Sequence, residues 1–237
     1  MNIPYPLQIV DNCRTCAIPQ QPGFCRLSPE ALQEFSKLRH PSIFPAGAVL
    51  LAEAQPPRGI YVVCSGRVKL STMSREGRVL ILRVAGPGEV LGLSAVMTGS
   101  ACELTAETVE PCHVSFVERI RLREFLVRYP EAGVRCAEAV SREFQAAFQD
   151  VHDLVLARTS TEKLARLLLS WSEAPEAGEA EARLDSGLTH EEMAQMIGSS
   201  RETVTRLLGE LRRKSLIRRD GAALIIQDRR ALEALAS

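Results

Sequence analysis

The chain has 237 residues, which is long enough for two domains that form their own cores without disulfide bonds. Its 29 Lys and Arg residues balance its 29 Asp and Glu residues, which argues against a protein that binds nucleic acid through a global positive charge and leaves room only for a local basic face. No apolar run approaches the roughly 20 residues needed to cross a bilayer, and residues 1–10 lack the basic start of a signal peptide, so we expect a cytoplasmic protein with no membrane segment.

Three of the seven cysteines lie in an N-terminal extension that we place at residues 1–30. Cys13, Cys16 and Cys25 have the spacing C-x2-C-x8-C. Thiolates this close in the chain can hold three corners of an iron–sulfur cluster, with a fourth ligand from elsewhere. Two alternatives remain open: these thiols can bind zinc or form a reversible disulfide, and Cys25 can be a small core residue.

Residues 31–120 are expected to form an antiparallel β-barrel or β-roll. Short runs rich in aliphatic and β-branched residues alternate here with Gly, Pro and charged turn residues, which is typical of such sheets. The expected strands are Val49–Leu51, Ile60–Val63, Arg67–Thr72, Val79–Val84, Leu104–Val109 and His113–Val117.

A long helix is expected within residues 121–157. Six of its positions are spaced four and three residues apart, which places them in a heptad seam along one face. The heptad seam consists of Ala137, Ser141, Phe144, Phe148, Val151 and Val155. Such a seam on a helix between two domains is suited to pack against the same helix of a second chain, which predicts a two-fold homodimer. The alternative is that the seam packs on the roll of its own chain.

Residues 158–237 are expected to form a second domain that contains a helix-turn-helix. Thr189 and Glu192 have the spacing of a capping box at the start of one helix, and Gly198 can end that helix. A second amphipathic helix is expected over residues 201–214. Two short helices joined by a glycine turn are the helix-turn-helix arrangement.

The second helix has a polar face at its N-terminal end, the end that helix-turn-helix motifs place against base edges. Arginine can donate two hydrogen bonds to guanine, and glutamate can accept one from cytosine. From Ser199 to Arg219 seven basic residues accompany two acidic ones, which supplies positive charge for phosphate contacts. A hairpin that turns at Asp220 and Gly221 is expected to form a wing. We expect DNA contacts from Thr189, Ser200, Arg201, Glu202, Thr205, Arg206, Arg212 and Arg213.

The segment from Gly198 to Leu208, with the sequence GSSRETVTRLL, closely resembles the recognition-helix signature of the Crp/Fnr transcription regulators. The order of roll, long helix and winged domain is similar to that family over nearly the whole chain. The resemblance implies an α+β fold with an N-terminal cyclic-nucleotide-binding-type β-roll (a jelly roll), a dimerisation helix and a C-terminal winged helix-turn-helix. It also implies a homodimer that binds double-stranded DNA and contacts RNA polymerase. Arg201, Glu202 and Arg206 match the family's base-reading positions, and Arg at position 201 predicts palindromes with TGTGA-like arms.

The resemblance also implies which small molecule or cofactor the roll can sense, and cyclic AMP is the first candidate. Gly86–Gly92 resembles the start of the family's phosphate-binding cassette, but Cys102 and Glu103 occupy the positions of the Arg-Ser pair that binds the cyclic phosphate. A carboxylate at this place opposes a phosphodiester, so we expect no binding of cyclic AMP.

Another part of the resemblance favours an iron–sulfur sensor. Cys112 lies in a segment that resembles the strand carrying the distant cluster ligand in the oxygen-sensing fumarate and nitrate reduction regulators. The gap between the second and third N-terminal cysteines is longer here than in the enteric oxygen sensors. The expected ligands of a 4Fe-4S cluster are then Cys13, Cys16, Cys25 and Cys112. The remaining thiols have no matching partner and are expected to be packing or incidental residues: Cys64, Cys102 and Cys136.

The sequence therefore predicts a DNA-binding regulator that responds to oxygen, nitric oxide or redox state through the cluster. The chain contains no Walker loop, no HExxH motif and no GxSxG motif, and no nucleophile is paired with a base, so an enzyme is not expected. The alternatives are a constitutive regulator without a ligand and a regulator that depends on thiol oxidation, haem or zinc.

Overall fold

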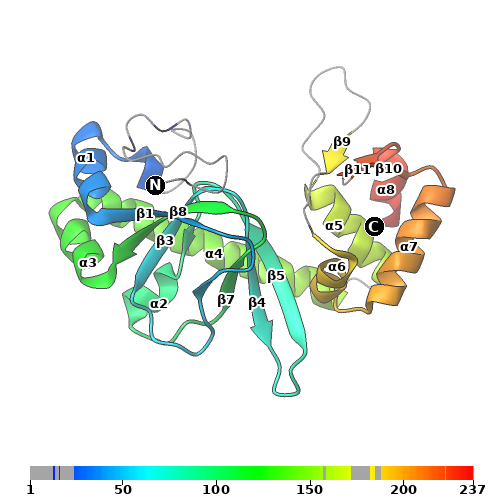
Figure 1. The fold of residues 1–237 in the computed structure, drawn as a ribbon, viewed down its shortest axis with the longest axis horizontal. Helices are drawn as coiled ribbons and strands as arrows, with labels where there is room; N and C mark the ends of the chain where they lie inside the picture. Colours follow the sequence, from blue (N-terminus) through cyan, green and yellow to red (C-terminus); the bar gives the residue numbers. More distant parts are fainter. Residues whose placement is uncertain are drawn as a thin grey trace. The chain divides into compact units, whose positions relative to one another are not determined.

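The computed structural model describes residues 13, 16, 24–156, 159–171, 182–184, 188–221 and 223–236, without the side chains of residues 149–156 and 182–183. The chain divides into two units, residues 1–147 and residues 148–237, each with its own hydrophobic core. Figure 1 shows the helices and strands of both units in chain order.

The first unit contains two four-stranded antiparallel sheets (Figure 1). The β8 sheet has the strand order β1-β8-β3-β6, and the β4 sheet has the order β2-β7-β4-β5. The strands are β1 (Arg39–Phe44), β2 (Val49–Leu51), β3 (Gly59–Ser65), β4 (Val68–Met73), β5 (Val79–Ala85), β6 (Val90–Leu91), β7 (Thr105–Thr108) and β8 (Cys112–Glu118). Their inner faces pack on each other and form the predicted roll.

The β8 sheet is buried on both faces. On its inner face, Cys112 and Val114 pack with Leu70 and other side chains of the β4 sheet. On its outer face, Val117 packs with residues of the covering helices. Successive side chains of a strand point to opposite faces, so Ser115 and Val117 lie on the face opposite to Cys112 and Val114.

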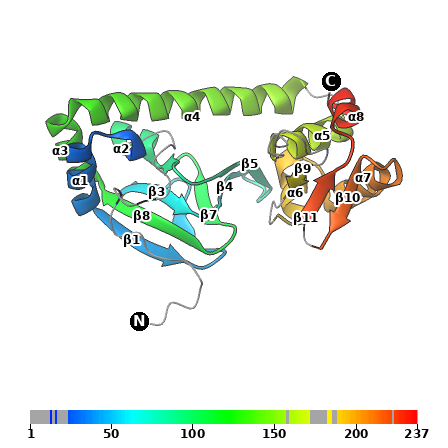
Figure 2. The same ribbon diagram turned by 90° about the horizontal axis from the view of Figure 1, so that it is seen from above.

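Helices cover the outer face of the β8 sheet. They are η2 (Phe24–Arg26), α1 (Pro29–Leu38), α2 (Leu93–Thr98), α3 (Arg119–Arg128) and the first part of α4 (Pro130–Leu156). The ring of Phe24 stacks on that of Phe35 with 5.1 Å between centroids, and both belong to one core cluster with Ala132, Cys136 and Ala139 of α4. Figure 2 shows that α3 leads directly into α4. The short helix η2, α1 and α4 therefore share one outer core.

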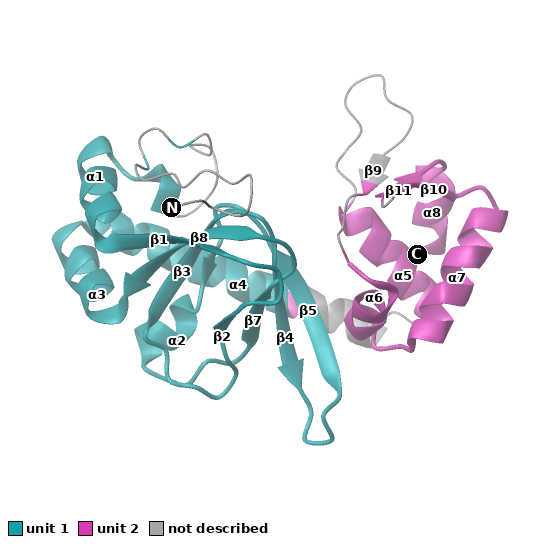
Figure 3. Cartoon of the chain, in the orientation of Figure 1, with its two compact units in different colours: residues 1–147 teal, residues 148–237 magenta. Residues whose placement is uncertain are grey.

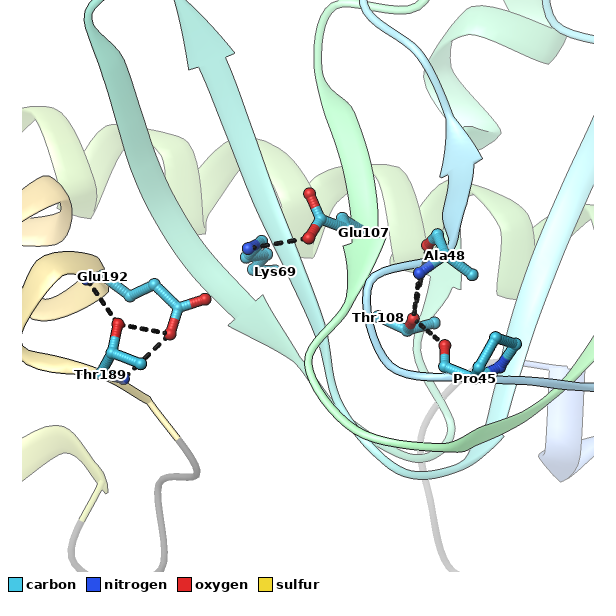
Figure 4. Close-up of polar contacts among 7 residues, drawn as sticks. All are labelled: Pro45, Ala48, Lys69, Glu107, Thr108, Thr189 and Glu192. Atoms are coloured by element: carbon cyan, nitrogen blue, oxygen red, sulfur yellow. Dashed lines mark hydrogen bonds and ion pairs between the residues drawn. The ribbon is translucent and has the colours of Figure 1, made fainter. Parts of the chain in front are cut away.

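Polar contacts fix the loops of the roll (Figure 4). Thr108 is 1% exposed, and its hydroxyl donates to the carbonyl of Pro45 at 2.6 Å and accepts from the amide of Ala48 at 2.9 Å. These bonds satisfy a buried hydroxyl and hold the turn before β2 against β7. Lys69 and Glu107 are cross-strand partners of β4 and β7 and form an ion pair with 3.0 Å between Nζ and Oε1.

In the described part of the second unit, magenta in Figure 3, the helices α5 to α8 and a three-stranded sheet pack around one core. Its elements are α5 (Ser160–Trp171), β9 (Ala182–Leu184), α6 (His190–Ile197), α7 (Arg201–Arg213), β10 (Ile217–Asp220), β11 (Ala223–Ile226) and α8 (Arg229–Leu235). The sheet is antiparallel with the order β10-β11-β9. Leu164, Leu168, Leu208 and Ile226 are at most 1% exposed and form the centre of this core.

Every predicted strand of the roll is present, with ends shifted by at most two residues, and the predicted hairpin forms β10 and β11. The strands β1, β6 and β9 and the helices η2, α1, α2 and α8 lie outside the predicted elements. The sequence of β1, RHPSIF, contains a proline and two basic residues, which is compatible with an edge strand but carries no alternation of apolar residues. Among the described helices, none is long and apolar enough to cross a membrane.

Candidate nucleic-acid interface and thiol pocket

Helix α6 begins with the predicted capping box (Figure 4). Thr189 Oγ1 accepts a hydrogen bond from the amide of Glu192 at 3.2 Å, and Glu192 Oε2 accepts one from the amide of Thr189 at 2.9 Å. The helix ends at Gly198, where φ is +62°, a conformation that favours glycine. Helix α7 begins after Ser200, whose hydroxyl accepts from the amide of Thr203 at 3.3 Å. These caps define a helix-turn-helix.

Helix α7 has one buried face and one exposed face. Val204, Leu207 and Leu208 are at most 3% exposed and pack into the core of the second unit. The opposite face, which we name the α7 surface, consists of Arg201, Glu202, Thr205 and Arg206, and all four residues are exposed. At the end of the helix Arg213 is exposed, whereas Arg212 is partly buried. The predicted base-reading residues therefore share one solvent-facing surface.

The α7 surface has its own electrostatic contacts. Arg206 Nη1 lies 2.6 Å from Glu210 Oε1, one helical turn further along. A hydrogen bond from its own backbone amide, together with the Ser200 hydroxyl, lowers the pKa of Glu202, so this carboxylate is an acceptor at neutral pH.

His190, which the sequence analysis does not single out, lies beside the α7 surface. Its Nδ1 is 2.9 Å from Thr205 Oγ1. Partial burial, and then the positive charges of Arg212, Arg201 and Arg219, lower the pKa of His190. Because these arginines make the imidazole harder to protonate, the electrostatic potential around His190 is positive, and such a potential attracts phosphate.

The hairpin of β10 and β11 lies directly after α7 in the chain. Arg218 and Arg219 are exposed on β10, and Arg219 Nε donates to the carbonyl of Gly221 in the turn at 2.9 Å. Gly221 has a φ of +59°. Like the predicted wing, this hairpin adds basic side chains next to the helix-turn-helix.

The heptad seam lies on α4, opposite to the face that packs in the outer core. Phe144 and Phe148 are 72% and 66% exposed, and Ala137 and Ser141 are exposed as well. Val151 and Val155 belong to α4, but their side chains lie outside the described residues. The described part of the seam is thus not covered by the roll of its own chain.

A pocket with a volume of about 30 Å³ lies on the outer side of the β8 sheet. The three N-terminal cysteines Cys13, Cys16 and Cys25 line it, together with Cys64, which the sequence analysis expects to be a packing or incidental residue. Burial, followed by the neighbouring thiols, raises the pKa of Cys25 to about 11. In the described part of the chain, no group of three or more Cys, His, Asp or Glu residues is preformed as a metal site, so a bound metal would have to draw these thiols together.

Cys112 lies elsewhere. It is fully buried between the two sheets, and its Sγ lies 3.2 Å from each of the carbonyl oxygens of Arg67 and Glu110. Burial raises the pKa of this thiol to about 11. The structure thus brings together three of the four predicted cluster ligands and leaves Cys112 on the other face of the β8 sheet.

Two family models cover most of the chain. A cyclic nucleotide-binding domain matches residues 42–129, and a Crp-like helix-turn-helix domain matches residues 162–235. The transcriptional regulator SdrP of Thermus thermophilus is 32% identical over 204 residues, which are 85% of this chain and 96% of SdrP. The chain belongs to the Crp/Fnr family. It is therefore a DNA-binding transcription regulator and not an enzyme, as the sequence predicts.

Other Crp/Fnr relatives agree with this assignment. A CRP-like cAMP-activated global transcriptional regulator of Mycobacterium tuberculosis is 27% identical over 206 residues, 86% of this chain and 92% of its own length. Among solved structures, a CRP/FNR-family regulator of Thermus thermophilus has a TM-score of 0.67 at 29% identity and covers 83% of this chain and 98% of its own. FixK2 of Bradyrhizobium japonicum, with a TM-score of 0.73 at 21% identity over 84% of this chain and 98% of its own, shares the fold. The predicted fold class is confirmed.

The part of this Crp/Fnr chain that resembles the phosphate-binding cassette is rich in carboxylates. Arg83 pairs with Glu89, whose second oxygen accepts from the amide of Gly86 at 3.0 Å. Glu143 of α4 faces the same charges: burial, and then the carboxylates of Glu103 and Glu89, raise its pKa to about 7 against the opposing effect of Arg83. The guanidinium of Arg83 is therefore already engaged by carboxylates.

Proposed function

We propose that this Crp/Fnr regulator acts as a homodimer that binds palindromic DNA with TGTGA-like arms. The observation that carries the proposal is the α7 surface, where Arg201, Glu202 and Arg206 are exposed at the N-terminal end of a recognition helix. A two-fold dimer would present two such helices to successive major grooves, about 34–36 Å apart. The exposed heptad seam supplies an apolar surface for that dimer. Contact with RNA polymerase belongs to the same proposal and rests on the family resemblance.

Selection of bound duplexes from a random pool tests the DNA proposal. We expect inverted pairs of TGTGA-like half-sites whose centres are separated by about 10–10.5 base pairs. The variant Arg201→Ala should select sites with relaxed preference at one guanine in each arm while keeping the spacing. Recovery of single, unpaired half-sites would refute the dimeric arrangement.

For the signal, we propose an iron–sulfur cluster held by the N-terminal thiols of Cys13, Cys16 and Cys25. When bound, the cluster supplies a group that oxygen or nitric oxide can oxidise or displace. The first support is that Cys13, Cys16 and Cys25 line one pocket. The second is that Cys13 packs against the outer core, which contains Ala132 and Cys136 of α4. A change in the N-terminal segment would alter the packing of the dimerisation helix, and we propose that the intact cluster favours the dimer.

Purification without air, followed by exposure to air, tests this signal. We expect iron and sulfide in the anaerobic protein, a broad visible absorption from iron–thiolate bonds, and loss of colour, dimer and DNA binding in air. Mass and DNA affinity are measured on the same samples. A colourless, iron-free protein that binds DNA equally well with and without air would instead favour the constitutive alternative.

We also propose that the protein does not bind cyclic AMP, although the relative from Mycobacterium tuberculosis is named as cAMP-activated. The carboxylates of Glu89 and Glu103 support this, because Glu89 already engages the guanidinium of Arg83 and Glu103 adds negative charge that would repel a phosphodiester. Calorimetric titration is expected to show no saturable heat; saturable binding would overturn the proposal.

A further inference from the structure

We propose that the fourth thiolate of the metal centre is Cys64, with Arg39 as its buried cationic neighbour, and that Cys112 takes no part. This inference rests on the proposed cluster, because it assigns a ligand to the same centre. Its basis is the pocket of about 30 Å³, which four thiols line: Cys13, Cys16, Cys25 and Cys64. Four thiolates are a complete ligand set for an iron–sulfur cluster and for a tetrahedral zinc ion.

Alternation along β3 places Cys64 on the outer side of the β8 sheet. In the pairing of β3 with β8, Val62 is opposite Ser115, and Val62 packs in the outer core. Cys64 is two positions after Val62, so its side chain lies on the same face of the sheet. Its Sγ lies 3.5 Å from Ser115 Oγ on the outer side of the sheet, where Ser115 lines the same pocket.

Strand alternation keeps Cys112 away. Ser115 is three positions along β8 from Cys112, so the two side chains point to opposite faces of the sheet. The inner face at Cys112 is closely packed, because a Cβ added to Gly66 would lie 2.6 Å from its sulfur. Cys112 is the first residue of β8 and is paired with Phe44 of β1, so a metal bound to the N-terminal thiols could reach this sulfur only if the start of β8 were released from β1 and turned over.

Charge gives independent support. Four thiolates around a divalent ion, or around a cluster core with two positive charges, carry two net negative charges, which are costly to bury without a cation. Arg39 lines the pocket, is 6% exposed, and donates from Nη1 to Ser115 Oγ at 3.0 Å. A buried guanidinium and a hydroxyl next to the sulfurs are suited to stabilise and orient such ligands from outside the coordination shell.

The test compares Cys64→Ser and Cys112→Ser in the full-length protein, with Cys102→Ser as the matched control for loss of a buried thiol away from the pocket. Each protein is reconstituted without air with ferrous iron and sulfide, and separately with zinc. Iron, sulfide and zinc per chain are measured before and after a chelator. We expect Cys64→Ser to lose metal about tenfold faster or more, and the other two variants to match the wild type. If Cys112→Ser lost its metal and Cys64→Ser retained it, the inference would be overturned and the cluster proposal would stay intact.

Footprinting of the wild-type protein removes any dependence on the folding of a variant. Native alkylation followed by mass spectrometry should modify Cys64 in metal-free protein and spare it in loaded protein, with Cys112 unchanged between the two. Metal-dependent protection of Cys112 rather than Cys64 would contradict the assignment. Wild-type protein that retains neither iron nor zinc would refute the metal centre itself, and the ligand assignment with it.

Discussion

Replacing Arg206 with alanine should weaken binding to a TGTGA-containing palindrome far more than binding to unrelated DNA. In the free protein, Arg206 is exposed and its Nη1 pairs with Glu210 at 2.6 Å. An exposed ion pair contributes about 0.2–1 kcal/mol, whereas a bidentate contact with guanine contributes about 1–3 kcal/mol. When Arg206 exchanges the carboxylate of Glu210 for a guanine, the net gain is therefore about 1–2 kcal/mol of binding free energy per half-site. For two half-sites the variant should raise Kd about 30- to 900-fold.

Fluorescence anisotropy at one fixed salt concentration measures this effect, with the palindrome and a scrambled duplex of equal length. Arg229→Ala is the matched control, because Arg229 forms the same kind of pair with Glu233, at 2.9 Å and four residues apart, on α8 instead of α7. The control should change neither affinity by more than about twofold, since surface substitutions usually stay within 0.5 kcal/mol. Equal losses on both duplexes in Arg206→Ala would show that this side chain contacts phosphates only, which would refute base reading at this position.

Three further predictions concern stability and assembly. Thr189→Ala removes the capping box of α6 and should lower the unfolding free energy of the second unit by about 0.5–2 kcal/mol in urea titrations. Thr189→Ser keeps the hydroxyl and should retain most of that free energy. Equal losses of unfolding free energy in the two variants would exclude the cap as the cause. Phe144→Ala should shift the dimer toward monomer in sedimentation equilibrium, because each phenyl ring that the dimer buries contributes about 1.5–3 kcal/mol to association. An unchanged mass distribution would count against the heptad seam as the dimer surface. Burial raises the pKa of Glu143 from 4.5 to about 7, so the folded state binds this proton more tightly than the unfolded state. The thermal stability of the wild type should therefore fall as pH rises from about 4.5 to above 7, and Glu143→Gln should flatten this part of a plot of Tm against pH. Parallel plots for the two proteins would contradict the raised pKa.

The helix-turn-helix was predictable because its signals are local. The capping residues Thr189 and Ser200, the glycine at position 198 and the apolar spacing of α7 each act within a few residues. The strands of the roll were predictable for the same reason, since each is bounded by turn residues. In contrast, β1 is held by its pairing with β8, where Arg39 is opposite Val117, and nothing in its own composition indicates a strand.

The thiol pocket could be predicted only in part, because it depends on long-range packing. The close spacing of Cys13 and Cys16 is visible in the sequence, and alternation along β3 places Cys64 on the same face as Val62. No local pattern shows that this is the face that the N-terminal cysteines meet. Alternation along β8 was available from the sequence, yet without the partner strands it does not say which face carries Cys112.

Helix α4 connects the thiol pocket to the proposed dimer surface. Its inward residues Cys136 and Ala139 belong to the outer core, against which Cys13 packs, whereas Phe144 projects outward in the heptad seam. At its first turn, Glu131 accepts hydrogen bonds from the backbone amide and the hydroxyl of Ser28, the residue that caps α1. A helix moves as a rigid element over a few turns, so a shift of the N-terminal segment would reach the seam through α4 without any rearrangement of the roll. We infer that the signal acts on dimer packing through this helix, with the two sheets serving as the fixed support.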